Sequence, residues 1–189
     1  PDMIEAGTYM IAAAAAGGTV KITNVIPRHL ESISAKMREM GVIVEDFDDY
    51  VVVSRDPQKK LGKINLKTMP YPGFPTDIQS PFMALCCVAD GSSMFVENIF
   101  ENRFQHVEEL ARMGADIKVD GRVAVVRGVE KLSGAKVVAK ELRGGAALIV
   151  AALAAEGTTE IEQIHYIDRG YESPEKVLQA CGANIRRKE

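Results

Sequence analysis

Three stretches of the chain are apolar on every side of the helix that each would form, and small residues such as Ala are frequent in them. They span residues 9–16, 82–89 and 146–155. A helix that is apolar all round is expected to be buried all round, and small side chains let such helices approach one another closely. The pattern therefore predicts three buried helices at the centre of the molecule.

A different pattern follows each apolar stretch. Strand-like runs come first, at residues 19–25, 93–99 and 158–164. In the first copy, apolar residues then recur at the spacing of one helical face. These residues are Leu30, Ile33, Met37 and Met40. We therefore expect amphipathic helices that bury one stripe, followed by short strands at 42–45, 50–54, 115–119 and 122–127. The Asp120-Gly121 pair predicts a hairpin turn between the last two.

Glycines mark corresponding points in the three copies. One set precedes the strand-like runs and is expected to cap the buried helices in the left-handed conformation: Gly18, Gly91 and Gly157. The other set closes the amphipathic helices: Gly41, Gly114 and Gly182. Because both sets recur at nearly constant spacing, the sequence predicts one domain of three repeats, at about 1–68, 69–134 and 135–189. The fold class is α/β, with buried helices inside and sheets outside.

Composition and charge narrow the classes of function. Lys and Arg number 23 against 26 for Asp and Glu, which gives a net charge of −3 and no basic surplus for nucleic acid. Trp is absent and aromatic residues make up 6%, which disfavours stacking platforms for single strands. No apolar run is long enough for a bilayer, and no signal peptide is recognisable, so we expect a cytoplasmic protein without a membrane partner. The chain begins without an initiator Met, which predicts a fragment.

Cysteine and histidine positions do not indicate a metal centre or a disulfide framework. Cys86, Cys87 and Cys181 lie in or at the end of apolar helices, so we expect small core residues rather than reactive thiols. The three histidines, at positions 29, 106 and 165, show no ligand spacing, and we expect them on the surface or in loops. No metal and no cofactor are predicted.

Five short strings, distributed along the whole chain, resemble the enolpyruvyl transferase family. They are residues 4–8 (IEAGT), 74–77 (FPTD), 100–104 (FENRF), 128–135 (GVEKLSGA) and 167–172 (IDRGYE). The likeness is greater to the members that act on UDP-N-acetylglucosamine than to 5-enolpyruvylshikimate-3-phosphate synthase. It implies an inside-out α/β barrel domain of three repeats, as the patterns above predict. It also implies that a partner is missing, namely the N-terminal half with the cysteine that acts as general acid.

The reaction implied by the resemblance moves the enolpyruvyl group of phosphoenolpyruvate to the 3′-hydroxyl of UDP-N-acetylglucosamine and releases phosphate. This is the first committed step of peptidoglycan synthesis, and it runs by addition and then elimination. A sugar hydroxyl is a poor nucleophile, so a base must take its proton. Phosphoenolpyruvate carries a phosphate and a carboxylate, so cationic groups must face it.

The resemblance assigns Asp77 as the catalytic base and as a substrate contact. Its position before an apolar run, after a Pro-Thr turn, is equally typical of a helix N-cap. A carboxylate at a helix N-terminus is held ionised by the local dipole, so the two roles are compatible.

The other substrate-binding residues implied by the resemblance are Ile99, through its backbone, and three arginines. Arg143 and Arg169 correspond to positions that contact phosphoenolpyruvate or its phosphate, and Arg103 is expected nearby. Arg143 precedes two glycines at a helix start, where free backbone N–H groups would add to an anion site. A solvated loop arginine remains the alternative for each. Glu141 stands where many members have Asp, and no role is carried over to it.

Two alternatives stay open at this point. One is a transferase like 5-enolpyruvylshikimate-3-phosphate synthase, and the other is a non-catalytic binding module of the same fold. If the implied site exists, the N-terminal ends of the buried helices, near Gly7, Asp77 and Gly144, must lie on one side of the domain.

Overall fold

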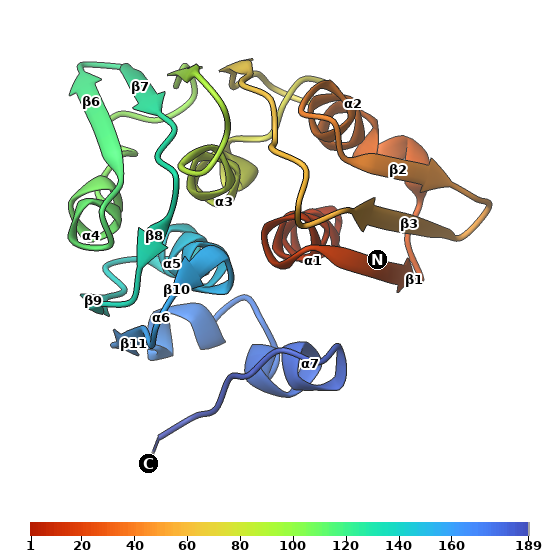
Figure 1. Cartoon of the computed structure of the whole chain (residues 1–189). Helices are drawn as coiled ribbons and strands as arrows, with labels where there is room; N and C mark the ends of the chain where they lie inside the picture. Colours follow the sequence, from red (N-terminus) through yellow and green to blue (C-terminus); the bar gives the residue numbers. More distant parts are fainter. Residues whose placement is uncertain (189) are drawn as a thin grey trace.

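The computed structural model describes residues 1–188, and three mutually packed helices form its centre. These helices are α1 (Met3–Ala16), α3 (Thr76–Cys86) and α5 (Leu142–Ala154). Strands and shorter helices surround them (Figure 1). Nearly every residue in the middle of each is buried, whereas the first turns of all three helices and the last turn of α5 are half-exposed. The prediction of three central buried helices is confirmed.

The elements after α1 build a small antiparallel sheet. They are β1 (Gly18–Thr23), the 3-10 helix η1 (Pro27–Leu30), α2 (Glu31–Glu39), β2 (Ile43–Asp46), β3 (Tyr50–Arg55) and β4 (Asn65–Lys67). The first three strands form a sheet in the order β1-β3-β2. The predicted apolar stripe of α2 is buried: Leu30, Ile33, Met37 and Met40 are at most 1% exposed.

The elements after α3 build a four-stranded sheet. They are β5 (Ser92–Val96), α4 (Val107–Arg112), β6 (Asp116–Asp120) and β7 (Val123–Arg127), and β4 adds to them in the order β4-β5-β7-β6. The predicted hairpin exists, but its turn lies one residue further along. Because Asp120 pairs with Val123, the two central turn residues are Gly121 and Arg122.

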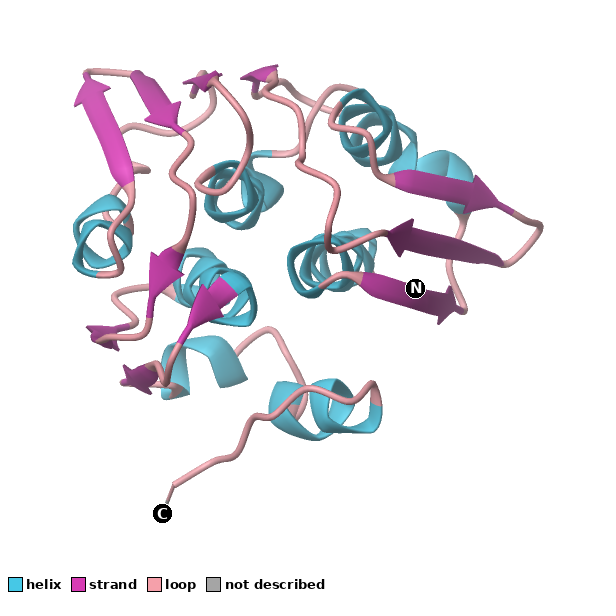
Figure 2. Ribbon diagram, viewed as in Figure 1, coloured by secondary structure: helices cyan, strands magenta, loops and turns pink. Residues whose placement is uncertain are grey.

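The elements around α5 are shorter. They are β8 (Leu132–Ser133), β9 (Lys136–Val138), β10 (Ala155–Glu156), β11 (Glu160–Glu162), α6 (His165–Asp168) and α7 (Pro174–Ala180). Two parallel pairs, β10 with β8 and β11 with β9, take the place of a larger sheet. Figure 2 shows these strands, like those of the other two sheets, outside the central helices.

The three outer helices end in the same way. Gly41, Gly114 and Gly182 all adopt left-handed backbone angles. In each case the N–H of the next residue bonds back to the carbonyl of a residue inside the helix: Met37, Leu110 or Leu178. This is the Schellman arrangement of a helix C-terminus.

The first set of glycines behaves differently from the prediction. Gly17, rather than Gly18, caps α1. Helices α3 and α5 end at Cys86 and Ala154, before Gly91 and Gly157. In α5 the chain leaves the helix directly into β10, because Ala155 is extended and pairs with Leu132.

Cys86 and Cys87 are fully buried, as expected, but Cys181 is exposed, and the expectation for that residue is wrong. Helices α2 and α4 are each followed by a strand that packs against them. Helix α7 lies at the edge of the molecule and is followed by an irregular tail (Figure 1). Within residues 1–188, no helix combines the length and apolar character that a membrane span requires.

Candidate functional site

Asp77 lies in the first turn of α3, and its carboxylate binds two arginines from other parts of the chain. Arg103 donates from Nη2 to Oδ1 at 2.7 Å, and Arg143 donates from Nη2 to Oδ2 at 3.3 Å. The helix begins after Pro75 and has no side-chain cap, so the N-cap interpretation of Asp77 is wrong. The carboxylate faces the arginines instead of the backbone amides of its own helix.

Arg103 comes from the segment between β5 and α4. Its side chain is 20% exposed, and its guanidinium lies 5.0 Å from the centre of the Phe100 ring. A cation above an aromatic face is attracted by the ring quadrupole. The ring and the carboxylate of Asp77 together hold Arg103 against the N-terminus of α3.

Glu97 organises the segment that carries Arg103, and sequence reasoning missed it. Its side chain is buried, and its carboxylate accepts hydrogen bonds from the hydroxyls of Thr68 and Thr76 at 2.9 and 3.0 Å. The backbone N–H groups of Ile99 and Phe100 also donate to it, at 2.9 and 3.2 Å. Four donors replace the water that a buried carboxylate would otherwise need.

Ile99 is half-buried in this same segment, and its N–H is already engaged by Glu97. A contact of the Ile99 backbone with a ligand therefore has to come from its carbonyl or from a rearranged turn.

Arg143 lies in the first turn of α5, and its side chain is 16% exposed. Besides its contact with Asp77, it donates from Nη1 to the hydroxyl of Tyr171 at 3.2 Å. The guanidinium is thus held between α3 and the segment that joins α6 to α7.

The expected free amides at the start of α5 are absent. Glu141 is the N-cap, and its carboxylate accepts from the N–H groups of Arg143, at 2.8 Å, and Gly144. The carbonyl of Glu141 accepts from Gly145. The prediction of an open backbone anion site is therefore wrong, because the residue just before the helix fills it. As the N-cap of α5, Glu141 has a local structural role.

Arg169 follows α6 and is exposed. Its side chain makes no ion pair or hydrogen bond with any residue in 1–188. The structure brings Arg103 and Arg143 to Asp77, but it does not bring Arg169 into contact with them.

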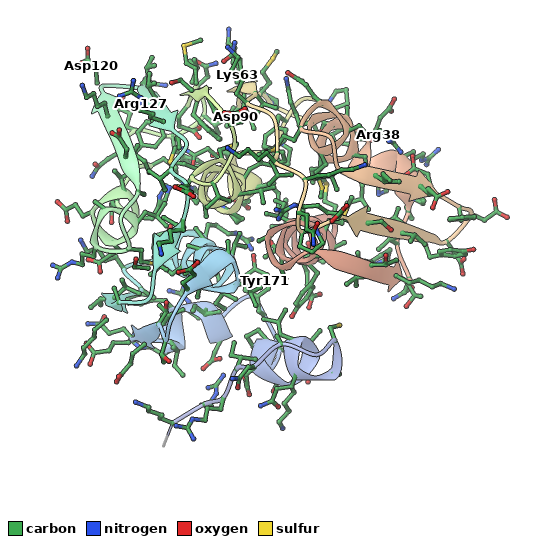
Figure 3. All side chains as sticks on the ribbon, viewed as in Figure 1. Arg38, Lys63, Asp90, Asp120, Arg127 and Tyr171 are labelled. Atoms are coloured by element: carbon green, nitrogen blue, oxygen red, sulfur yellow. The ribbon has the colours of Figure 1, made fainter. Side chains whose placement is uncertain are left out.

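Contacts of Arg143 and Tyr171 connect the N-terminal halves of the three buried helices. Arg143 joins α5 to α3 through Asp77, and Tyr171 joins α5 to α1 through a 2.8 Å contact between its hydroxyl and Thr8 Oγ1. Figure 3 shows Tyr171 in the interior, while the labelled charged residues Arg38, Lys63, Asp120 and Arg127 lie at the periphery. The expectation that these helix ends lie on one side is consistent with these contacts.

His106 lies beside the site, and the expectation of a surface histidine is wrong for it. It precedes α4, is 3% exposed, and places Nε2 3.3 Å from Met83 Sδ. Burial, and secondarily the charge of Arg103, lower the pKa of His106 to about 3. The ring is therefore neutral at physiological pH.

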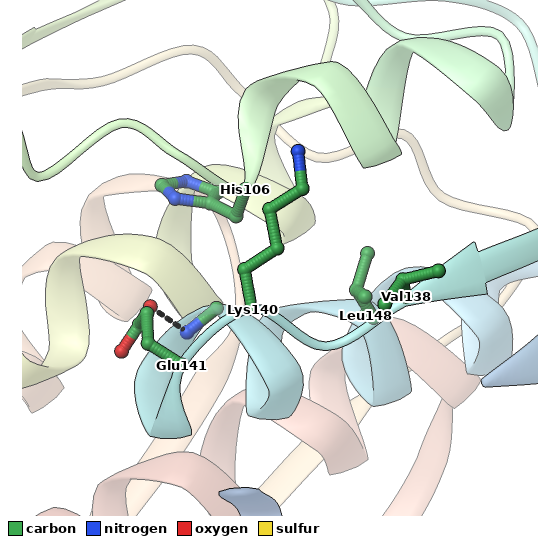
Figure 4. A pocket seen from close by; sticks show the side chains of 6 residues that line it. His106, Val138, Lys140, Glu141 and Leu148 are labelled. Atoms are coloured by element: carbon green, nitrogen blue, oxygen red, sulfur yellow. Dashed lines mark hydrogen bonds between the residues drawn. The ribbon is translucent and has the colours of Figure 1, made fainter. Parts of the chain in front are cut away.

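A small pocket beside His106 is lined also by Val138, Lys140, Glu141, Gly144 and Leu148 (Figure 4). It leaves almost no room for a water molecule. The described residues thus bring Asp77 together with the guanidinium groups of Arg103 and Arg143, but they leave no deep cavity beside His106.

The comparisons with known proteins agree on one protein family. The family model of EPSP synthase (3-phosphoshikimate 1-carboxyvinyltransferase) matches residues 1–178. UDP-N-acetylglucosamine 1-carboxyvinyltransferase 3 of Caldanaerobacter subterraneus subsp. tengcongensis is 58% identical over 187 residues, which are 99% of this chain and 44% of that relative. The chain therefore spans about half the length of the curated relatives it matches.

Solved structures agree with this. The enolpyruvyl transferase NikO from Streptomyces tendae superposes with a TM-score of 0.88 at 30% identity, over 98% of this chain and 44% of that chain. EPSP synthase from Acinetobacter baumannii superposes with a TM-score of 0.78 at 15% identity, over 100% of this chain and 47% of that chain. At that identity the second likeness concerns the fold alone.

Proposed function

The chain belongs to the EPSP synthase family of enolpyruvyl transferases, and we propose that it is part of an enzyme that uses UDP-N-acetylglucosamine. This enzyme transfers the enolpyruvyl group of phosphoenolpyruvate to the 3′-hydroxyl of the sugar and releases phosphate. The observation that carries the proposal is the 58% identity to a relative named for this reaction. Identity to the EPSP synthase structure is only 15%. The product serves peptidoglycan synthesis, and the charged, phosphorylated substrates favour a cytoplasmic location.

Asp77 is the proposed base. It takes the proton of the sugar hydroxyl as the hydroxyl oxygen bonds to the central carbon of phosphoenolpyruvate. A second proton adds to the terminal carbon of phosphoenolpyruvate from a group outside this chain, which gives a tetrahedral intermediate. The bond between the central carbon and the phosphate oxygen then breaks, one proton leaves the terminal carbon, and the double bond forms again in the product.

The two arginines on Asp77 suit such a reaction. A phosphate or carboxylate of the substrate competes with Asp77 for the same guanidinium donors, because all three are planar or tetrahedral oxyanions. When Arg103 and Arg143 turn to the substrate, the oxygens of Asp77 become free to accept a proton. Arg169, which has no partner in residues 1–188, supplies a third cation for the substrate. Ile99 contacts the nucleotide sugar through its backbone.

The remaining half of the site is proposed to come from residues beyond this chain, because the curated relative is more than twice as long as the matched part. We propose further that the three central helices and the outer sheets form an inside-out α/β barrel. Its three repeats are residues 1–68, 69–134 and 135–189. The recurring helix ends at Gly41, Gly114 and Gly182 support this division.

The test is phosphate release from phosphoenolpyruvate. The chain is assayed alone and combined with the N-terminal half of the Caldanaerobacter relative, with UDP-N-acetylglucosamine or with shikimate 3-phosphate as acceptor. Release only from the combined halves and only with the sugar nucleotide supports the proposal. Release with shikimate 3-phosphate selects the alternative acceptor, and assembled halves without any release select a binding module. Activity of the chain alone refutes the division of the site.

A further inference from the structure

Tyr171 contacts Arg143 at Nη1, whereas Asp77 contacts it at Nη2, and Thr8 contacts the Tyr171 hydroxyl in turn. Tyr171 is 3% and Thr8 6% exposed, and neither is among the residues assigned above to the reaction. The Tyr171 hydroxyl lies 2.8 Å from Thr8 Oγ1 and 3.2 Å from Nη1 of Arg143. The buried Tyr171 hydroxyl thus contacts both helix α1, through Thr8, and the guanidinium of Arg143 in the candidate site.

The direction of these hydrogen bonds follows from counting protons. A threonine hydroxyl has a single proton, and that of Thr8 is donated to the carbonyl of Ile4 at 2.8 Å. Thr8 Oγ1 can therefore only accept from Tyr171. The Tyr171 proton points to Thr8, so the lone pairs of the Tyr171 oxygen remain for Arg143, whose guanidinium can only donate.

Burial also keeps this arrangement intact around neutral pH. Desolvation raises the pKa of the Tyr171 hydroxyl above its ordinary value, although the contacts with Thr8 and Arg143 act against it. The hydroxyl therefore keeps the proton that it gives to Thr8.

From this geometry we propose that Tyr171 is a positioning residue for Arg143, oriented by Thr8, and that the pair presents Arg143 to the anionic substrate. The proposal rests on the proposed function. Arg143 is held at Nη1 by Tyr171 and at Nη2 by Asp77. When a substrate anion takes the place of Asp77, the Tyr171 contact still fixes the guanidinium plane. A cation oriented in advance loses less side-chain entropy on binding, which strengthens the binding of phosphoenolpyruvate.

Tyr9 provides a matched control. Its ring packs edge-on against Tyr171, with centroids 6.5 Å apart, and its buried hydroxyl has no partner in residues 1–188. Tyr171→Phe and Tyr9→Phe each remove one buried hydroxyl oxygen from the same aromatic pair. Only the first removes a contact with Arg143. Thr8→Val removes the acceptor at nearly constant volume, and Thr8→Ser keeps it.

The first experiment observes Arg143 directly, by NMR of the guanidinium groups in the 189-residue chain. Tyr171→Phe is expected to speed rotation of the Arg143 Nη groups and to abolish their resolved signals, and Thr8→Val to do so in part. Thr8→Ser and Tyr9→Phe are expected to match the wild type. Unchanged Arg143 signals in both Tyr171→Phe and Thr8→Val would overturn the proposal. If Tyr171→Phe fails to fold, the comparison of the Arg143 signals in Thr8→Val with those in Thr8→Ser decides by itself.

The second experiment measures steady-state kinetics with the combined halves described above. Loss of a hydrogen bond to a charged group is expected to raise KM for phosphoenolpyruvate about tenfold in Tyr171→Phe, with a smaller change in kcat. A residue that merely stabilised the fold would reduce the number of active molecules, lowering kcat at constant KM, and that result refutes the positioning role. If the wild type shows no turnover, the proposed function fails, while the NMR result still decides whether Tyr171 orients Arg143.

Discussion

Arg103 donates a 2.7 Å hydrogen bond to Oδ1 of Asp77, although the two residues lie 26 positions apart in the chain. Arg143 takes the other oxygen from a distance of 66 positions. The carboxylate lies between two cations and offsets one of their two charges, so the three groups together keep a net charge of +1 that attracts an anionic substrate. Under the proposed function, an anionic substrate replaces Asp77 on the arginines, and the same exchange exposes the proposed base.

Asp77→Asn is the most direct test of the base. Asparagine keeps the shape of the side chain but cannot take up the hydroxyl proton, so kcat in the combined halves is expected to fall on the order of a thousandfold. Phosphate release at saturating substrates measures it. The arginines lose their competing anion, so phosphoenolpyruvate should bind at least as tightly as in the wild type. Turnover like that of the wild type removes Asp77 from the base role.

Arg169→Ala separates binding from stability. Because Arg169 is exposed and has no partner in the described part of the chain, the free energy of unfolding is expected to change by less than about 0.5 kcal/mol. KM for phosphoenolpyruvate is expected to rise by about tenfold or more, through loss of a charge-assisted contact with the substrate. Urea denaturation and steady-state kinetics give the two values. An unchanged KM makes Arg169 a solvated loop residue, and Arg127→Ala, at another exposed arginine without a side-chain partner in residues 1–188, is the control.

Much of the fold was readable from local patterns. The all-round apolar stretches became α1, α3 and α5, and the stripe at Leu30, Ile33 and Met37 became the buried face of α2. Such patterns are informative because a helix buried on one side has apolar residues at the spacing of one helical face. A helix buried on all sides is apolar throughout.

The site was less accessible to the same reasoning, since its contacts join distant parts of the chain. Asp77 at a helix start is compatible with a cap, and only the start of α3 after Pro75 and the positions of the two arginines decide against it. Glu141 illustrates the opposite error. The two glycines after it suggested free amides, but a carboxylate directly before the helix can fold back and occupy them. Glutamate is not among the residues that usually cap a helix N-terminus, so this role of Glu141 had little signal in the sequence.

Substitution of Glu97 tests whether its buried carboxylate shapes the site. Glu97→Gln replaces one acceptor oxygen by a donor that faces donors, so at least one of the bonds from Thr68, Thr76 and the Ile99 amide is lost. The free energy of unfolding is expected to fall by about 2 kcal/mol, as measured by urea denaturation. Glu101→Gln, whose carboxylate is 88% exposed, is the control and should stay within about 0.5 kcal/mol of the wild type. Equal stability of both variants would show that Glu97 contributes nothing specific.

His106 gives a pH dependence with a definite sign. Its pKa is lowered to about 3 in the folded chain, against an ordinary value of 6.5 in the unfolded chain. Above pH 6.5 both states carry a neutral ring, and the group does not affect stability. Between pH 6.5 and 3 the unfolded chain binds a proton that the folded chain refuses, so stability is lost as the pH falls, by up to about 1.4 kcal/mol per pH unit.

His106→Gln removes this titration, and its effect is read from urea denaturation at pH 7.5, 5.5 and 4.5. The variant is expected to be less stable than the wild type at pH 7.5, because its amide is buried where the ring packs against Met83. The difference in unfolding free energy should shrink as the pH falls below 6.5, because only the wild type then pays for keeping its ring neutral. His165→Gln, at an exposed side chain of α6, is the control and should stay within about 0.5 kcal/mol of the wild type. A difference between His106→Gln and wild type that stays constant from pH 7.5 to 4.5 would mean that the imidazole accepts its proton in the folded state, through a local opening between α3 and α4.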